Sequence, residues 1–116
     1  MTIGDGADWT GTTQHQGARI SFKVDFASSS STVQFEIGAY QPAYVVAENL
    51  KNAWNANYPG EAKLDTNDLT IVRFDRNGEM PTAMSIKVGA SGAPQDLPAF
   101  GTPVQVVLGL TVHNTQ

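Results

Sequence analysis

Cysteine is absent from this chain of 116 residues, and histidine occurs only twice. The lack of cysteine excludes disulfides, thiolate metal ligands and a cysteine nucleophile. The 7 Lys and Arg residues are scattered and are outnumbered by 11 Asp and Glu, so the formal net charge is −4. Nucleic acids and anionic membranes bind clusters of basic side chains, so neither is expected as a partner.

Long hydrophobic runs are lacking as well. No segment approaches the roughly 18 apolar residues that a membrane span needs. The first 17 residues contain neither the basic region nor the apolar region of a signal peptide, so we expect the protein to be cytoplasmic at synthesis or to reach the outside by a route that needs no leader. Hydrophobic residues make up 41% of the chain, which is enough for one globular domain of this length.

The segment 1–17 shows no periodicity and is rich in Gly, Thr, Asp and Gln. It is predicted to be a flexible N-terminal arm, followed by a single domain over 18–116. Trp9 is the only large apolar residue of the arm after Ile3. An alternative is therefore an arm that orders against a neighbouring subunit, with Trp9 as its anchor.

Alternation of apolar and polar residues predicts two strands that form an antiparallel hairpin between Ile20 and Ile37, with Ser28–Ser31 at the turn. A helix is predicted after Pro42, which is well placed in a first turn. Its apolar stripe consists of residues at helical spacing: Ala43, Val46, Ala47, Leu50, Ala53 and Trp54.

The remainder of the chain favours further strands. They are expected at Glu61–Leu64, at Leu69–Phe74 in a central position, at Met84–Val88, and at Val104–Val112 as one closing strand. Gly89–Pro103 is expected to be a long loop rich in Gly, Ala and Pro. The order β-β-α-β-β-β-β predicts an α+β, mostly β fold, with one amphipathic helix on an antiparallel sheet of about six strands.

The series of hairpin, helix and second hairpin resembles a module of bacteriophage virion and tail proteins and of flagellar hook-associated proteins, the IN motif. The resemblance rests on the first hairpin, Leu50–Asn57 of the helix, Ala62–Leu64, Asp68–Ile71 and Ser85–Val88. Trp54-Asn55-Ala56 takes the place of the Ile-Asn-Ala that ends the helix of the module. The chain lacks the long terminal helices of the flagellar proteins, so the resemblance implies a virion part, such as a tail, fibre-base or capsid-decorating protein.

The sequence shows no catalytic pattern. His15 and His113 lie near the chain ends without spaced partners, and no Gly-rich stretch fits a phosphate-binding loop. Acidic residues gather around two turns but lack the spacing of a calcium loop, so they are interpreted as turn residues: Asp65, Asp68, Asp75 and Glu79. We therefore predict no catalytic residue, no metal site, no cofactor and no enzymatic activity.

Four aromatic residues are the candidates for an interface: Trp9, Tyr40, Tyr44 and Phe100. Trp9 and Phe100 lie in segments without periodicity to bury them, although Phe100 could also pack onto its own core. Tyr40 and Tyr44 flank Pro42, where local packing is the alternative to contact with a sugar or a partner. The expected function is that of a homo-oligomeric virion structural protein that binds other virion proteins. The alternatives are a small carbohydrate-binding or adhesin-type module and, less favoured, an enzyme subunit with its site between chains.

Overall fold

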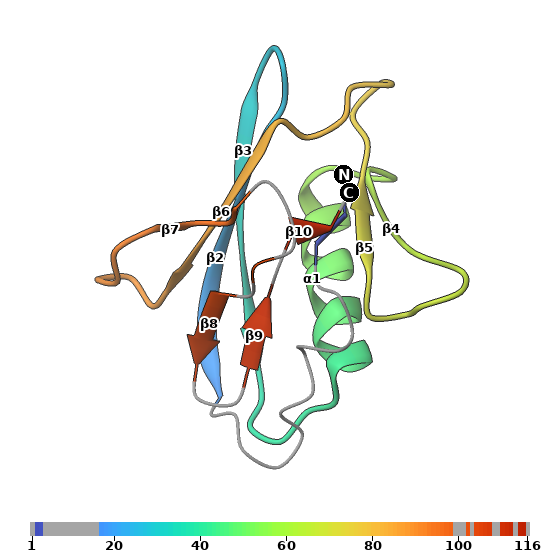
Figure 1. Cartoon of the computed structure of the whole chain (residues 1–116). Helices are drawn as coiled ribbons and strands as arrows, with labels where there is room; N and C mark the ends of the chain where they lie inside the picture. Colours follow the sequence, from blue (N-terminus) through green and yellow to red (C-terminus); the bar gives the residue numbers. More distant parts are fainter. Residues whose placement is uncertain are drawn as a thin grey trace.

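The structure is a computed structural model that describes residues 2–3, 17–98, 102, 104–107, 110–112 and 114–115. One helix packs with antiparallel sheets, which confirms the predicted α+β, mostly β class (Figure 1). The elements in chain order are β1 (Thr2–Ile3), β2 (Ala18–Asp25), β3 (Ser30–Ile37), α1 (Ala43–Asn57), β4 (Ala62–Leu64), β5 (Val72–Phe74), β6 (Ala83–Val88), β7 (Gln95–Asp96), β8 (Val104–Val107), β9 (Leu110–Val112) and β10 (Asn114–Thr115).

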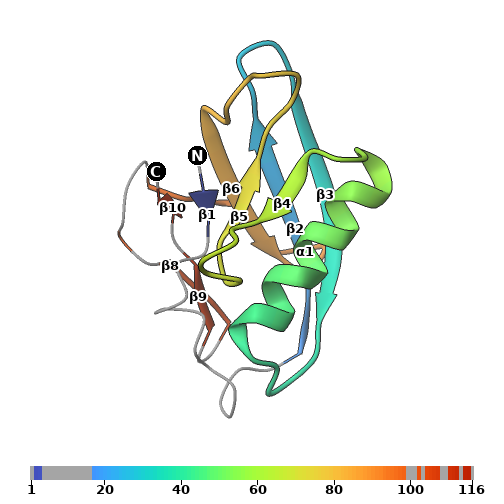
Figure 2. The same cartoon turned by 90° about the vertical axis from the view of Figure 1, so that its right-hand side faces the viewer.

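The strands are divided between sheets. The main sheet has the order β3-β2-β6-β7, a second sheet has the order β10-β1-β5-β4, and β8 pairs with β9. Helix α1 and the strands β4 and β5 lie on one side of the main sheet (Figure 2). The opposite side of the main sheet carries the polar residues of the alternating strands and faces solvent.

The core lies between α1 and the main sheet. Val46, Leu50 and Trp54 are fully buried on the helix, as the apolar stripe predicts. They pack with the inner face of the hairpin, where the Phe22 and Trp54 rings meet edge to face at 6.2 Å between centroids. Phe22 is itself fully buried on β2. The predicted packing of helix on hairpin is thereby confirmed.

Asn55 makes a contact that helical periodicity did not indicate. Its side-chain amide donates to the carbonyl of Ala62 and accepts from the Ala62 N–H, both at 2.9 Å. The Asn55 amide therefore bonds both main-chain groups of Ala62, the first residue of β4, as a neighbouring strand would do. The helix ends two residues later at Asn57, shortly before Pro59.

Three predicted elements differ from the structure. The closing strand Val104–Val112 is instead a hairpin of β8 and β9, in which Val104 pairs with Val112. Within the expected loop Gly89–Pro103, β7 pairs with β6, and Leu97 is buried. Leu69–Phe74 is shortened to β5, because Asp68 bonds the Thr70 N–H and closes a turn. β5 does lie centrally, between β1 and β4.

Within the predicted N-terminal arm 1–17, Thr2 and Ile3 form β1 and pair with β5 and β10. Residues 4–16 lie outside the described part of the chain.

Candidate interaction surface

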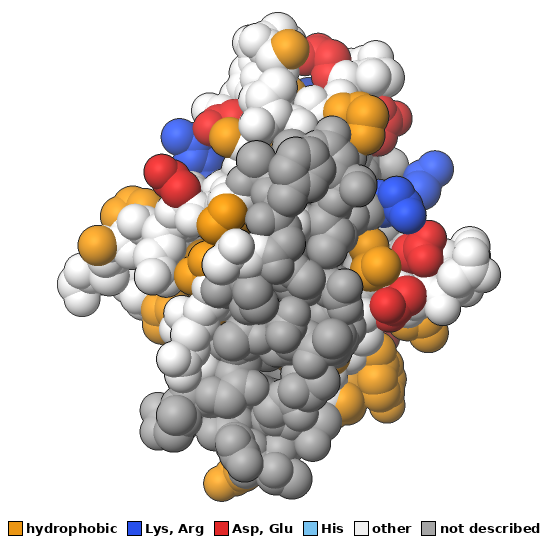
Figure 3. Space-filling view, viewed as in Figure 1, with side chains coloured by type: hydrophobic (Ala, Val, Ile, Leu, Met, Phe, Trp, Pro, Cys, Tyr) orange, Lys and Arg blue, Asp and Glu red, His pale blue; other side chains and the backbone are white. Residues whose placement is uncertain are grey.

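Two of the four predicted interface residues are described, and both are exposed. Tyr40, between β3 and α1, is 64% exposed, and Tyr44, in the first turn of α1, is 52% exposed. Figure 3 shows hydrophobic side chains at the surface at the lower right, where Figure 1 has the first turns of α1. This exposure leaves both residues accessible to a partner. Trp9 and Phe100 lie outside the described residues.

Tyr40 also has a left-handed backbone, with φ of 62°. This conformation costs a residue with a Cβ roughly 1–2 kcal/mol, and Gly or Asn would adopt it more readily. The turn is held by the Gly38 N–H, which donates to Oε1 of Gln41 at 2.7 Å. A large exposed aromatic residue at a strained position suggests a role in contact, because neither burial nor backbone preference accounts for it.

The outer side of β3 is the second feature of this region. β3 is an eight-residue strand at the edge of the main sheet, paired with β2 along its whole length without a register shift. Among the described residues, no strand pairs with its other side. We use the name edge surface for the outer side of β3, Ser30–Ile37, together with Tyr40 and Tyr44.

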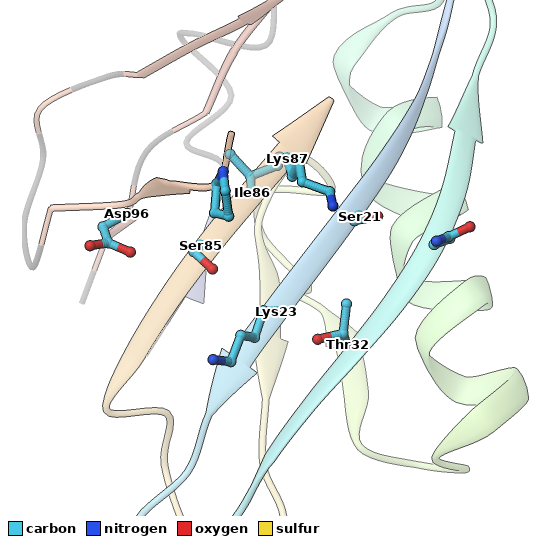
Figure 4. Close-up of a pocket in the computed structure, with 9 residues that line it drawn as sticks. Ser21, Lys23, Thr32, Ser85, Ile86, Lys87 and Asp96 are labelled. Atoms are coloured by element: carbon cyan, nitrogen blue, oxygen red, sulfur yellow. The ribbon is translucent and has the colours of Figure 1, made fainter. Parts of the chain in front are cut away.

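A polar hollow of about 390 Å³ lies on the solvent face of the main sheet. Figure 4 shows side chains of β2, β3 and β6 around it, with the amino group of Lys87 directed toward Ser21 of β2. Lys23 pairs with Asp25 at 3.6 Å. Among the described residues that line the hollow none is aromatic, so these residues offer no stacking platform for a sugar ring.

Arg76 organises a partly buried cluster at the turns beside β3. Its Nε donates to Oε2 of Glu61 at 2.8 Å and its Nη2 donates to Oε1 at 3.0 Å, so the pair is bidentate. The guanidinium lies 4.5 Å from the ring centroid of Phe26 and 4.8 Å from that of Tyr58. Trp54 Nε1 donates to Glu61 Oε1 as well, at 3.0 Å.

The same guanidinium reaches the beginning of β3. It donates to the Ser29 hydroxyl at 3.1 Å and to the Ser31 hydroxyl at 2.9 Å. Burial raises the pKa of Glu61, but the hydrogen bonds from Arg76 and Trp54 and the charge of Arg76 outweigh it and hold that pKa below its ordinary value. Each of the three guanidinium nitrogens of Arg76 donates to a protein side chain, so we assign the cluster the structural role of fixing this end of the edge strand.

The acidic residues of the two turns bond neighbouring protein groups. Asp65 Oδ2 accepts from the N–H of Asp68, and Asp68 Oδ1 accepts from the N–H of Thr70. Glu79 accepts from the N–H and the hydroxyl of Ser28. The contacts of Asp65 and Asp68 agree with the interpretation as turn residues, whereas Glu79 bonds Ser28 of a different turn. In the described part of the chain, no group of three or more His, Cys, Asp or Glu is arranged to hold a metal ion, and no helix is long and apolar enough to cross a bilayer.

Comparisons with protein-family models, curated proteins and solved structures return no match for this chain. The case for a function therefore rests on its own residues.

Sequence reasoning missed both the open side of β3 and the cluster around Arg76. The strand itself was predicted, but its place at the sheet edge depends on which strands pair. The only sequence signal for an open edge was the absence of Lys and Pro between Ser30 and Ile37. For Arg76 the sequence held no signal, because Glu61 lies 15 residues away.

Proposed function

We propose that this chain is a non-enzymatic virion structural protein that acts by self-association and by docking to other virion proteins through the edge surface. The observation that carries the proposal is the long unpaired side of β3 with two exposed tyrosines following it. An open strand edge is a template for pairing with another chain, and soluble monomers normally protect it.

The tyrosines support contact with protein. Tyrosine is enriched among the residues that dominate binding energy at interfaces, because it offers a large rigid surface with a polar end. Trp9 and Phe100 stay proposed as additional anchors. The described side chains do not favour nucleic acid, because Lys and Arg are interspersed with Asp and Glu on the face in Figure 3. The resemblance of the hairpin, helix and hairpin series points to the virion.

A carbohydrate-binding or adhesin-type module is the second candidate function. The same exposed Tyr40 and Tyr44 favour it, since aromatic rings stack on sugars. The hollow on the polar face gives it no support, because the lining residues that the structure describes include no aromatic side chain. The two candidates therefore compete for the same tyrosines, and one set of variants distinguishes them.

The test is the solution mass of the full chain by sedimentation and light scattering over a range of concentrations. We expect the wild type to be a multimer and Tyr40→Ser/Tyr44→Ser to associate more weakly. Leu69→Ser/Met80→Ser is the matched control, because both residues are large, apolar and exposed but lie outside the edge surface. A wild type that stays monomeric at high concentration would overturn self-association, and tyrosine-dependent binding to a glycan array would then favour the carbohydrate module.

A further inference from the structure

The direction of the main-chain groups of β3 follows from two hydrogen bonds. The Phe26 N–H donates to the Ser29 carbonyl at 2.6 Å at the hairpin turn. Because hydrogen-bonded pairs alternate along an antiparallel ladder, the odd-numbered residues of β3 bond to β2. On the far side of β2, the Gly89 N–H donates to the Arg19 carbonyl at 2.8 Å, which fits the same alternation.

The even-numbered residues of β3 therefore turn their N–H and C=O groups outward. These residues are Ser30, Thr32, Gln34 and Glu36, whose side chains are all on the exposed face. Four donors and four acceptors thus form one straight row at the sheet edge. No hydrogen bond within the described structure uses these backbone groups.

The other edges of the two four-stranded sheets are short, in contrast to β3. β7 is two residues long and lies between Pro94 and Pro98, while β10 and β4 have two and three residues. Short strands and nearby prolines are the usual protection of a sheet edge. β3 has eight residues and contains no Pro, no Lys and no bulge. Among the described edges of the two four-stranded sheets, the edge at β3 is therefore the one suited to pairing.

We propose that β3 pairs antiparallel with β3 of a second copy of this chain, around a two-fold axis at Val33, so that two main sheets become one eight-stranded sheet. The proposal deepens the proposed function and rests on it, since it names the partner and geometry of the edge surface.

The register follows from three conditions. The buried faces of the two β3 strands must lie on the same side of the joined sheet. The residues with outward N–H and C=O groups must lie opposite such residues of the second copy, and like charges must not lie opposite each other. Centring on Val33 places Thr32 opposite Gln34 of the second copy, and Ser30 opposite its Glu36. All four outward residues then pair, with eight hydrogen bonds between the chains. Centring on Gln34 would pair only three outward residues, and centring on Glu36 would place two carboxylates opposite each other.

A second copy fits this edge because the sequence of β3 is complementary to itself in that register. Thr32 and Gln34 can bond through their side chains, and the single charge of the strand faces a serine. The inner residues Val33 and Phe35 are buried on the side of α1, so the apolar layers of the two copies would continue across the axis. A contact of this isologous kind is the usual one in homodimers.

The first test is Gln34→Pro in the full chain. Proline removes an outward N–H and adds its ring to the edge, while the bonds to β2 stay intact, so the fold is retained. We expect the dissociation constant of the multimer to rise by about tenfold or more. Gln34→Thr is the matched control, because it keeps the N–H and favours a strand. Circular dichroism and thermal unfolding verify that both variants are folded.

The second test is cross-linking, for which the lack of native cysteine leaves no background. In the proposed register Thr32→Cys and Gln34→Cys lie opposite each other, with Cα atoms about 5.5 Å apart, within the span of a disulfide. We expect a mixture of these two variants to form the disulfide dimer under mild oxidation. Either variant alone should not, because equal residues would be about 7–8 Å apart. Ser21→Cys on β2 controls for random collision.

The outcomes separate this proposal from the proposed function. A wild-type multimer whose mass is unchanged by Gln34→Pro, or whose mixed cysteine variants do not cross-link faster than Ser21→Cys, overturns the pairing of β3 and leaves self-association intact. A monomeric wild type overturns both. Loss of association in Gln34→Pro together with cross-linking of the mixture supports the pairing and its register.

Discussion

Replacing Arg76 with methionine is expected to destabilise the fold by up to about 3–5 kcal/mol, the range for breaking one side of a fully buried ion pair, because the pair with Glu61 is mostly but not fully buried. Methionine keeps an unbranched apolar side chain against Phe26 and Tyr58 but removes the charge and the donors. The Arg76 and Glu61 side chains are only 13% and 18% exposed, so the carboxylate of Glu61 would stay desolvated with Trp54 as its remaining donor.

The loss has identifiable parts. Charge-assisted hydrogen bonds contribute about 1.5–3 kcal/mol each before coupling between them is considered. Each cation–π contact contributes about 0.5–2 kcal/mol, depending on desolvation. The bonds to the Ser29 and Ser31 hydroxyls add to these. Because the parts share one guanidinium they are not additive, and the total is expected within the stated range.

The assay is urea denaturation of the wild type, Arg76→Met, Glu61→Gln and the double variant, followed by far-ultraviolet circular dichroism. We expect the double variant to lose at least about 1 kcal/mol less than the sum of the single losses, because the second change removes a charge that the first left unpaired. Arg19→Met is the matched control, since its pair with Glu36 is 60% and 70% exposed and contributes at most about 1 kcal/mol.

Two results would refute this reasoning. One is a loss below about 1 kcal/mol for Arg76→Met, and the other is strict additivity in the cycle. Added salt should weaken the Arg19 pair but hardly affect the Arg76 pair, because buried charges are screened far less than exposed ones.

Four further predictions follow from the core, the pKa of Glu61, the strained tyrosine and the turns. Leu50→Ala should cost about 2–5 kcal/mol in denaturant titration, because Leu50 is fully buried between helix and sheet; a loss below about 0.5 kcal/mol would contradict that packing. The pKa of Glu61 is lowered on folding, so its contribution to stability is present above the ordinary glutamate pKa of about 4.3 and is lost as the pH falls through the lower folded value. Glu61→Gln should therefore unfold with a weaker dependence on pH below about 4.3 than the wild type, as measured by thermal melts. Tyr40→Asn should raise the melting temperature when the wild type and the variant are compared at a concentration where both are monomeric, because asparagine tolerates the left-handed backbone. An unchanged or lower value under that condition would show that Tyr40 is not strained. Titration calorimetry with calcium, magnesium and zinc should show no tight binding. A dissociation constant below about 1 μM that is lost in Glu79→Gln would show that the acidic residues of the turns form a metal site.

The local patterns of the sequence determined much of the fold. Alternation between Ile20 and Ile37 identified the hairpin, and helical spacing identified α1 with its buried Val46, Leu50 and Trp54. These predictions succeeded because burying one face of a strand or helix leaves a period of two or of about 3.6 in the sequence itself. Tyr40 and Tyr44 were candidates because they flank Pro42 at the start of the helix, and the structure shows that both are exposed.

Tertiary structure alone decided which strands are neighbours. Alternation from Val104 to Val112 is the same for one strand and for the hairpin of β8 and β9, so the sequence could not distinguish them. The two residues of β7 are too few to carry a period, and Asn55 on the polar side of α1 finds Ala62 only because β4 returns there. Pairing depends on contacts between residues far apart in the chain, and no local pattern encodes those. That is why β3 could be read as a strand from its residues, whereas its open edge could be recognised only from the order β3-β2-β6-β7.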